Sequence, residues 1–243
     1  MISIFSIIGK TASGKDYLRK NSVIFDHMNY NKPMTTRPKR EGEDNDNYIF
    51  VDEGFDFTGS LCCTNYLIKP KVTWTYGHLW KQIKKGDNVS IYSIDSLNQL
   101  IERDLVPFVI KVETPYHIRE RDYYLRVDEE SEDTFASREA RDFKVDDFPC
   151  DLLITRGRNN AYSYTLRESQ EDFDYIDPTV LKWFVCFNYN DNLPCYLEDK
   201  GIDFRTKDGV CKFKYNKKLL KEIATKKAKY VQWGTVLFLD FDN

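Results

Sequence analysis

The chain has 243 residues, a formal net charge of −3 and 15% aromatic residues. This length suits one domain with an extension or two small domains, and the composition is that of a folded protein. The charge balance gives no general sign of binding to nucleic acid or to anionic membranes. No apolar run approaches the roughly 20 residues that span a bilayer, and the first residues lack the basic start of a signal peptide.

The six cysteines form no C-x-x-C pair, since Cys62 and Cys63 are adjacent and the others are scattered. This spacing argues against a zinc site and against a disulfide framework, and it favours reduced thiols. We therefore expect a cytoplasmic protein, a monomer or homodimer, with no membrane partner and no nucleic-acid partner.

Strands and helices alternate in the predicted elements of the first 170 residues. Strands are expected at 2–8, 88–94, 106–112 and 151–155, and helices are expected from residue 16 and over 96–103. The segment 35–58 is typical of an irregular or antiparallel lobe, and the charged stretch 118–147 has a helical pattern. This alternation favours an α/β fold with a mostly parallel sheet.

The pattern changes after about residue 170. Strands are predicted at 183–189, 210–215 and 236–241, and a helix at 217–230, which indicates a C-terminal α+β extension over 171–243. Residues 212–229 hold eight lysines against Glu222 alone. A solvated helix face is the simpler explanation, and a surface for phosphate, nucleic acid or a partner is the alternative. An appended domain, a dimerisation element and a specificity cap all stay open for the extension.

Residues 9–15 read GKTASGK, which fits the phosphate-binding pattern G-x-x-x-x-G-K between an apolar strand and a helix. Glycines allow the backbone to approach closely, successive N–H groups surround a β-phosphate, and Lys15 places a charge between the β- and γ-phosphates. A strand–turn–helix with an exposed lysine is the alternative. The residues predicted to hold ATP are Gly9, Lys10, Thr11, Ala12, Ser13, Gly14, Lys15 and Asp16.

Asp16 stands where Ser or Thr usually helps to hold Mg²⁺. A carboxylate can bind the metal directly or through water, because Mg²⁺ prefers oxygen ligands. It can instead serve the helix N-terminus electrostatically, and without a metal it would repel phosphates. The sequence therefore predicts Asp16 as the metal ligand and leaves an inactive site as the alternative.

The segment TTRPKREGEDNDNYIFV at 35–51 places two arginines three residues apart, ahead of a tyrosine. Arg37 and Arg40 offer forked donors for phosphate oxygens, and Tyr48 adds a hydroxyl. By composition alone a charged surface hairpin is the alternative. The segment resembles the guanylate kinase signature T-T-R-x-x-R-x-x-E followed by Y-x-F-V, whose arginines and tyrosine bind the phosphate of GMP. Glu43 matches the acidic residue of that motif, with a spacing to Tyr48 that is one residue shorter.

Further marks of the guanylate kinase family follow in the same order. Tyr76-Gly77 matches a Tyr-Gly pair, Ile94-Asp95 matches an I-D pair after a strand, and residues 151–162 loosely match a strand followed by a helix that carries Ala-Tyr. The resemblance covers about residues 2–170. It implies a P-loop NTPase-type three-layer fold with a monophosphate-binding lobe at about 35–80 and a lid at about 118–147.

Three departures from the family fall in its base-reading and nearby active-site residues. Leu67 stands at the position of a Glu that reads guanine, His78 replaces a Ser or Thr, and Ser93 replaces an Asp. Buried guanine N–H groups without acceptors would cost roughly 1–3 kcal/mol each, so another base, a modified base or a deoxynucleotide stays open. The resemblance implies acceptor contacts at Arg37, Arg40, Glu43, Tyr48, Tyr76, Gly77, His78, Ser93 and Asp95.

Five arginines lie among acidic residues between 119 and 141. Phosphoryl transfer needs positive charge around the transferred group, and lid arginines clamp the phosphates in guanylate-kinase-like proteins. A solvated helix with ion pairs is the alternative. By position, the resemblance implies catalytic roles for Arg121, Arg126 and Arg138 beside Lys15, with Arg119 as a substitute.

The hypothesis from the sequence is ATP- and Mg²⁺-dependent phosphorylation of a nucleoside or deoxynucleoside monophosphate, with GMP or dGMP as the first choice. One alternative is a non-catalytic guanylate-kinase-like module that binds proteins, which Asp16 and Leu67 favour and the intact Gly14-Lys15 pair opposes. The other is a P-loop kinase or NTPase whose acceptor is not a nucleotide.

Overall fold

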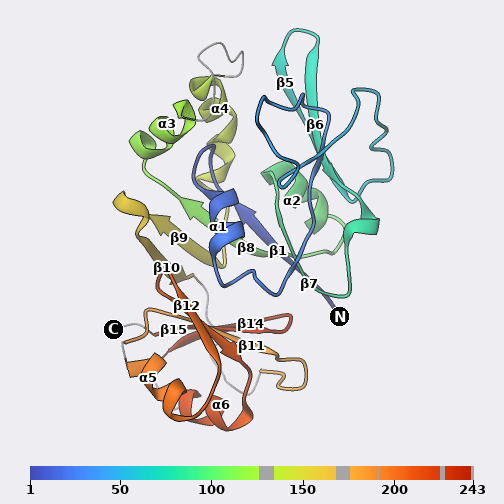
Figure 1. Ribbon diagram of the computed structural model, residues 1–243. Helices are drawn as coiled ribbons and strands as arrows, with labels where there is room; N and C mark the ends of the chain where they lie inside the picture. The colour runs from blue at the N-terminus through green and yellow to red at the C-terminus, as the bar shows by residue number, and fades with distance from the viewer. Residues whose placement is uncertain (126–133, 168–175, 191, 225–227, 242–243) are drawn as a thin grey trace.

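A six-stranded sheet with the strand order β10-β9-β8-β1-β7-β2 lies at the centre of the computed structural model (Figure 1). The structure describes residues 1–125, 134–167, 176–190, 192–224 and 228–241. All neighbours in this sheet pair in parallel except β9 and β10, so the predicted mixed α/β class with a mostly parallel sheet is confirmed. Its strands are β1 (Ile2–Ile8), β2 (Asn29–Tyr30), β7 (Gly86–Ile91), β8 (Phe108–Glu113), β9 (Leu152–Arg156) and β10 (Tyr162–Leu166).

The two faces of the central sheet belong to different apolar clusters. Side chains alternate along a strand, so Phe5 and Ile7 of β1 enter one cluster while Ile4 and Ile8 enter the other. Helix α2 (Ile94–Ile101) covers the second face, and Leu18 of helix α1 (Lys15–Asn21) packs on the first. The near-continuous apolar run of β1 is therefore what a strand buried on both faces requires.

A second sheet forms the lobe that contains the Arg37 segment. Its order is β4-β3-β6-β5, and the long antiparallel hairpin of β5 and β6 projects from the top of the molecule (Figure 1). Helices α3 (Tyr116–Tyr124) and α4 (Phe135–Arg141), with the turn η2 (Asp142–Val145), stand beside it at the same end and are here called the lid. The lobe consists of β3 (Met34–Thr35), β4 (Ile49–Phe50), β5 (Cys62–Lys69), β6 (Val72–His78) and the turn η1 (Trp80–Gln82).

Residues 183–240 form a third sheet, of order β12-β13-β11-β15-β14, with two helices on one face. Its other face packs against the central sheet, where the rings of Phe108 and Phe238 stack with centroids 4.7 Å apart. Phe5 contacts the same ring of Phe238. The elements are β11 (Trp183–Phe187), α5 (Asn192–Asp199), β12 (Phe204–Lys207), β13 (Val210–Lys214), α6 (Lys217–Ala224), β14 (Lys229–Trp233) and β15 (Val236–Asp240).

A buried polar cluster crosses the junction between the central sheet and the third sheet. Lys212 donates to the Val23 carbonyl at 2.9 Å and contacts Asp26 and His27, while Thr235 and His27 both contact Asp87. Burial lowers the pKa of His27, which favours its neutral form. We call Asp26, His27, Asp87, Lys212 and Thr235 the sheet–sheet network.

Two helix predictions are wrong at particular residues. The helix predicted over 217–230 ends at Ala224, because Tyr230 belongs to strand β14 and packs into the apolar cluster of the third sheet. Tyr162 does not begin a helix after β9. It begins β10, whose alternating burial of Tyr164 and Leu166 follows the period of a strand antiparallel to β9.

Candidate functional site

The loop of residues 9–15, here called the phosphate loop, joins β1 to α1 and depends on its glycines. A Cβ on Gly9, where φ is 154°, would lie 2.5 Å from the Val112 carbonyl oxygen, so no other residue fits there without a shift of backbone. Gly14 has φ 93° and precedes the first residue of α1. Lys15 folds back over the loop, and its Nζ donates to the carbonyls of Gly9 at 2.5 Å and Lys10 at 2.8 Å.

One cavity of about 250 Å³ adjoins the phosphate loop, the lobe, α2 and the lid. Residues from four separate parts of the sequence therefore meet around a single space, which is large enough for a small polar ligand. The predicted site residues that line it are Gly9, Thr11, Lys15, Asp16, Tyr48, Tyr76, His78, Ser93, Asp95 and Arg138. Lys10, Ala12, Ser13, Gly14, Arg37, Arg40, Glu43, Gly77 and Arg121 are not among its lining residues.

Arg37 does not line this cavity but lies next to Tyr48, which does. The Arg37 side chain is 4% exposed, one guanidinium nitrogen donates to both Glu43 carboxylate oxygens at 2.7 and 2.9 Å, and the guanidinium stands 5.4 Å from the Tyr48 ring. Desolvation works against the charge of Arg37, but the bond to Glu43 outweighs it and raises the pKa of Arg37. Glu43 therefore fixes Arg37 as a charged group directly behind Tyr48.

Arg40 is near two other arginines. Desolvation lowers the pKa of Arg40, and the like charges of Arg37 and Arg138 lower it further. The same three charges act on Tyr76, whose pKa is nevertheless raised because its ring is buried. An anion beside Tyr76 would relieve the mutual repulsion of these guanidinium groups.

Tyr48 and Tyr76 connect the arginines to the cavity. Their rings meet edge to face with centroids 5.8 Å apart, and burial raises the pKa of Tyr48 well above its ordinary value. Both hydroxyls therefore stay protonated at neutral pH and can donate a hydrogen bond. Packing favours glycine at position 77, since a Cβ there would lie 2.6 Å from the ring of Phe57.

The wall farther from the phosphate loop is mainly aromatic. His78 is buried, and burial alone lowers its pKa to about 3, so it stays neutral. Its Nε2 is 2.7 Å from the Ser90 hydroxyl, and its ring centroid is 4.3 Å from that of Tyr92. Leu67 is 66% exposed, so the position of the family's guanine-reading Glu does not face this cavity.

Ser93 and Asp95 lie where β7 ends and α2 begins. The Ser93 hydroxyl accepts from the Ser96 amide at 3.1 Å as the cap of α2, and it is 2.5 Å from the hydroxyl of Thr64. Asp95 pairs with Lys144 of the lid at 2.8 Å. Ser93 is thus held by the fold, while Asp95 ties the lid to α2.

Asp16 carries the strongest sign of a cation site. Its Oδ1 is buried and accepts no hydrogen bond from any residue that the structure describes. The same residue lines the cavity beside Lys15 and the phosphate loop. An acceptor-only oxygen there fits Mg²⁺, which takes one or two carboxylates and completes its shell with phosphates and water. Within the described ranges, no group of three or more His, Cys, Asp or Glu side chains is arranged to hold a metal ion.

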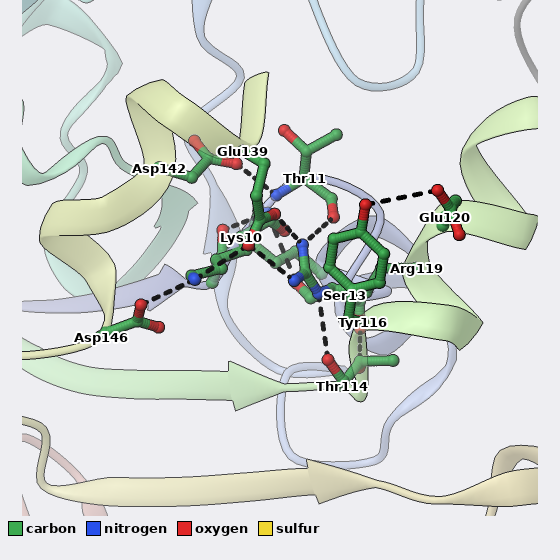
Figure 2. A network of polar contacts seen from close by, with 12 residues as sticks. Lys10, Thr11, Ser13, Thr114, Tyr116, Arg119, Glu120, Glu139, Asp142 and Asp146 are labelled. Atoms are coloured by element: carbon green, nitrogen blue, oxygen red, sulfur yellow. Dashed lines mark hydrogen bonds and ion pairs between the residues drawn. The ribbon is translucent and has the colours of Figure 1, made fainter. Parts of the chain in front are cut away.

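Carboxylates of the lid also contact the phosphate loop (Figure 2). Glu139 receives Arg119 in a forked pair at 2.5 and 3.0 Å and also Lys10 at 3.0 Å, while Asp142 accepts from the Thr11 amide at 2.5 Å. The bond from Arg119 is the main cause that lowers the pKa of Glu139. We call Lys10, Thr11, Arg119, Glu139 and Asp142 the loop–lid network.

The predicted lid arginines have different places. Arg138 lines the cavity, with its guanidinium 5.3 Å from the Tyr123 ring. Arg121 faces a separate groove of about 490 Å³ and pairs with Asp122 at 2.8 Å. Arg126 lies outside the described residues. Arg119, the predicted substitute, is buried in the loop–lid network.

Several residues at the site were missed from the sequence. Tyr66 and Trp74 line the cavity from the β5–β6 hairpin, and the alternation of larger side chains in those strands was the signal that could have found them. Arg156 pairs with Asp122 at 2.8 Å next to Gly14. No local pattern marks Arg156, Glu139 or Asp142.

None of the helices in the described ranges combines the length and apolar character needed to cross a bilayer. Comparisons of this chain with protein-family models and with curated proteins find no match, so the functional interpretation depends on the geometry of the site itself.

Proposed function

We propose that this protein transfers the γ-phosphoryl group of ATP to a nucleoside or deoxynucleoside monophosphate, as a divergent guanylate-kinase-like enzyme with a P-loop NTPase-type fold. One observation carries the proposal. The cavity of about 250 Å³ has the phosphate loop with Lys15 on one wall and Tyr48 and Tyr76, backed by arginines, on another. Donor and acceptor phosphates bound to these walls would face each other.

At the donor end, the phosphate loop and Lys15 hold the triphosphate. Lys15 now donates to carbonyls of its own loop and would exchange them for phosphate oxygens, which are stronger acceptors. Asp16 would hold Mg²⁺, which supplies neutralising charge between the phosphates. The buried, unbonded Oδ1 of Asp16 supports this role.

At the acceptor end, the hydroxyls of Tyr48 and Tyr76 donate to the monophosphate, with Arg37 and Arg40 behind and beside them. Burial lowers the pKa of Arg40, and the nearby charges of Arg37 and Arg138 lower it further, which supports the binding of an anion at this point. The aromatic wall and the neutral His78 suit a base held by stacking rather than by a carboxylate. GMP and dGMP remain the first acceptors to test, beside the other bases.

Transfer needs positioning and electrostatic stabilisation rather than a covalent intermediate. Arg138 lines the cavity between the two walls, where its charge would stabilise the transferred group. Unpaired thiols at all six cysteines suit the cytoplasm, where ATP and Mg²⁺ are supplied. A monomer or homodimer suffices, since the described cavity is formed within one chain.

The test is one panel in which the purified full chain receives Mg-ATP and each of the nucleoside and deoxynucleoside monophosphates in turn. We expect acceptor-dependent ADP release, and Lys15→Ala should lower it about 10²-fold or more because it removes a charge aimed at the reacting phosphates. Lys20→Ala is the matched control, since Lys20 lies on the same helix and pairs only with carboxylates of the lobe in the described structure.

The other outcomes separate the alternatives. ADP release that does not depend on any nucleotide acceptor would favour a P-loop kinase or NTPase with another substrate. Absence of turnover and of ATP binding in both the wild type and Lys15→Ala would favour a non-catalytic binding module and contradict the proposal.

A further inference from the structure

Glu139 is the central group of the loop–lid network. Its carboxylate joins three elements that are distant in sequence: Lys10 of the phosphate loop, Arg119 of α3 and its own helix α4 (Figure 2). Arg119 and Glu139 have only 5% and 24% of their side-chain surface exposed. A forked pair with this little exposure fixes orientation as well as distance.

The residue before Glu139 is Arg138, which lines the cavity together with Arg141 of the same helix. Successive residues of an α-helix point about 100° apart, so a helix that presents Glu139 to the phosphate loop must present Arg138 elsewhere. Here that direction is the cavity, near Tyr76 and Arg40. The rotation of α4 about its own axis therefore fixes both the contact of Glu139 and the direction of the Arg138 side chain.

Helix α4 has seven residues, which is too short to be stable or oriented by itself. Two kinds of contact fix it. Phe135 is buried against Tyr123 and Ala12, which holds the start of the helix. Glu139, with Asp142 on the Thr11 amide just beyond the helix, ties its later turns to the phosphate loop.

We propose that Glu139 is a positioning residue for phosphoryl transfer: it locks α4 onto Lys10 and Arg119 and thereby aims Arg138 at the cavity. This inference rests on the proposed function. Glu139 touches no reacting atom in this scheme. Loss of its charge leaves Phe135 packed and Arg138 beside the Tyr123 ring, so the lid stays folded while the rotation of α4 that aims Arg138 is less tightly fixed.

The test compares Glu139→Gln with Glu120→Gln in the full chain. Gln keeps the size of the side chain and removes its charge. Glu120 lies on the neighbouring helix α3 and bonds only the exposed Tyr116 hydroxyl in the described structure, so it is the matched control. We expect Glu139→Gln to lower kcat about 10- to 100-fold, the scale of a small misplacement in an active site, with KM changed less than about 3-fold. Glu120→Gln should match the wild type.

A double-mutant cycle with Arg138→Met distinguishes positioning from general destabilisation. If Glu139 acts through Arg138, Glu139→Gln has no further effect on kcat once Arg138 is Met. An equal loss of kcat in both backgrounds, or wild-type kcat in the single variant, would overturn the inference.

Hydrogen exchange provides a readout that does not need turnover. The amides of residues 135–141 should exchange faster in Glu139→Gln than in Glu120→Gln, because one tie of α4 is lost. Equal exchange in the two variants would refute the link. A wild type without turnover would instead refute the proposed function, and the exchange data would still decide whether Glu139 holds α4.

Discussion

The sheet–sheet network and the loop–lid network use the same chemistry in different surroundings. In the first, Lys212 meets Asp26 with 2% of the lysine side chain exposed, and in the second, Lys10 meets Glu139 with 19% exposed. The first lies between two apolar sheets, and the second lies beside the phosphate loop. The lysine of the first pair is shielded from water, although Asp26 is 28% exposed and also pairs with Arg205.

This difference decides what each network can do. A buried charge that loses its partner remains without water, so the sheet–sheet network must stay intact. The loop–lid network presents carboxylates to a lysine and a backbone amide that would also suit phosphate. The proposed nucleotide could therefore displace Asp142 from the Thr11 amide, while Arg119 holds Glu139 in place. The following predictions test this contrast.

The largest effect is expected from Lys212→Met. Removing this ammonium group leaves the buried Val23 carbonyl without its donor and leaves Asp26 with Arg205 as its remaining partner, which should cost about 1–3 kcal/mol of unfolding free energy. Lys10→Met should cost about 1 kcal/mol or less, because its ion pairs with Glu139 and Asp146 are both partly exposed. Urea unfolding of both variants measures the contrast, and equal losses would contradict it.

Gly9→Ala should have the next largest effect. The new Cβ would overlap the Val112 carbonyl, so we expect a loss above about 1 kcal/mol and a collapse of ATP binding. Gly42→Ala is the control for backbone strain alone, since φ there is 69° and nothing lies within 4 Å of the added Cβ. Thermal unfolding and ATP titration measure the two effects. A Gly9→Ala protein no less stable than Gly42→Ala would show that the phosphate loop can shift.

The two networks should also fail at different pH. The folded-state pKa of His27 lies below its ordinary 6.5, so the unfolded chain binds more protons and stability falls as pH drops below about 6.5. Glu139 has a pKa below its ordinary 4.5, so its contribution is present above that pH and is lost below it.

Urea midpoints between pH 8 and pH 3 measure both steps. His27→Gln should reduce the decline just below pH 6.5, to which the buried His78 also contributes, and leave the Glu139 step unchanged, whereas Glu139→Gln should remove that step alone. A single decline that neither variant alters would mean that other groups dominate acid unfolding.

The smallest effect is expected from Asp142→Asn. Asn keeps an oxygen that can accept from the Thr11 amide, but it removes a negative charge from the place where phosphates would bind. Charges about 4 Å apart interact by roughly 1 kcal/mol in water, so KM for Mg-ATP should fall about 2- to 5-fold. Asp147→Asn, an exposed neighbour, is the control. An unchanged or higher KM would mean that Asp142 does not compete with the nucleotide.

Local signals explain what the sequence could predict. Strand β1 and the phosphate loop follow from an apolar run and from glycines that the backbone requires, as the close approach of Gly9 to Val112 shows. The predicted start of helix α2 was two residues too late, because Ser93 and not a later residue caps the helix. The hairpin of β5 and β6 was missed because its two-residue turn, Pro70-Lys71, lacks the Gly, Asn or Asp that usually marks a hairpin, although larger side chains alternate along β6.

Non-local contacts explain what could not be predicted. Glu139 contacts Lys10 across 129 positions of sequence, and no residue near either one announces the pair. Phe238 packs against Phe5 of β1 in the same way, although the two residues are far apart in the sequence. Leu67 stands where the guanylate kinase resemblance would place a glutamate, and it is 66% exposed, so in the proposed function any contact to a base would come from other side chains.

The shared apolar face has a consequence for synthesis. Phe5 is made more than 200 residues before Phe238, which covers it. At roughly 5–20 residues per second, this face stays open for roughly 10 to 50 seconds during translation. We expect nascent chains to depend on chaperones for that interval, and chains that stop short of β15 to aggregate rather than to accumulate as a smaller folded protein.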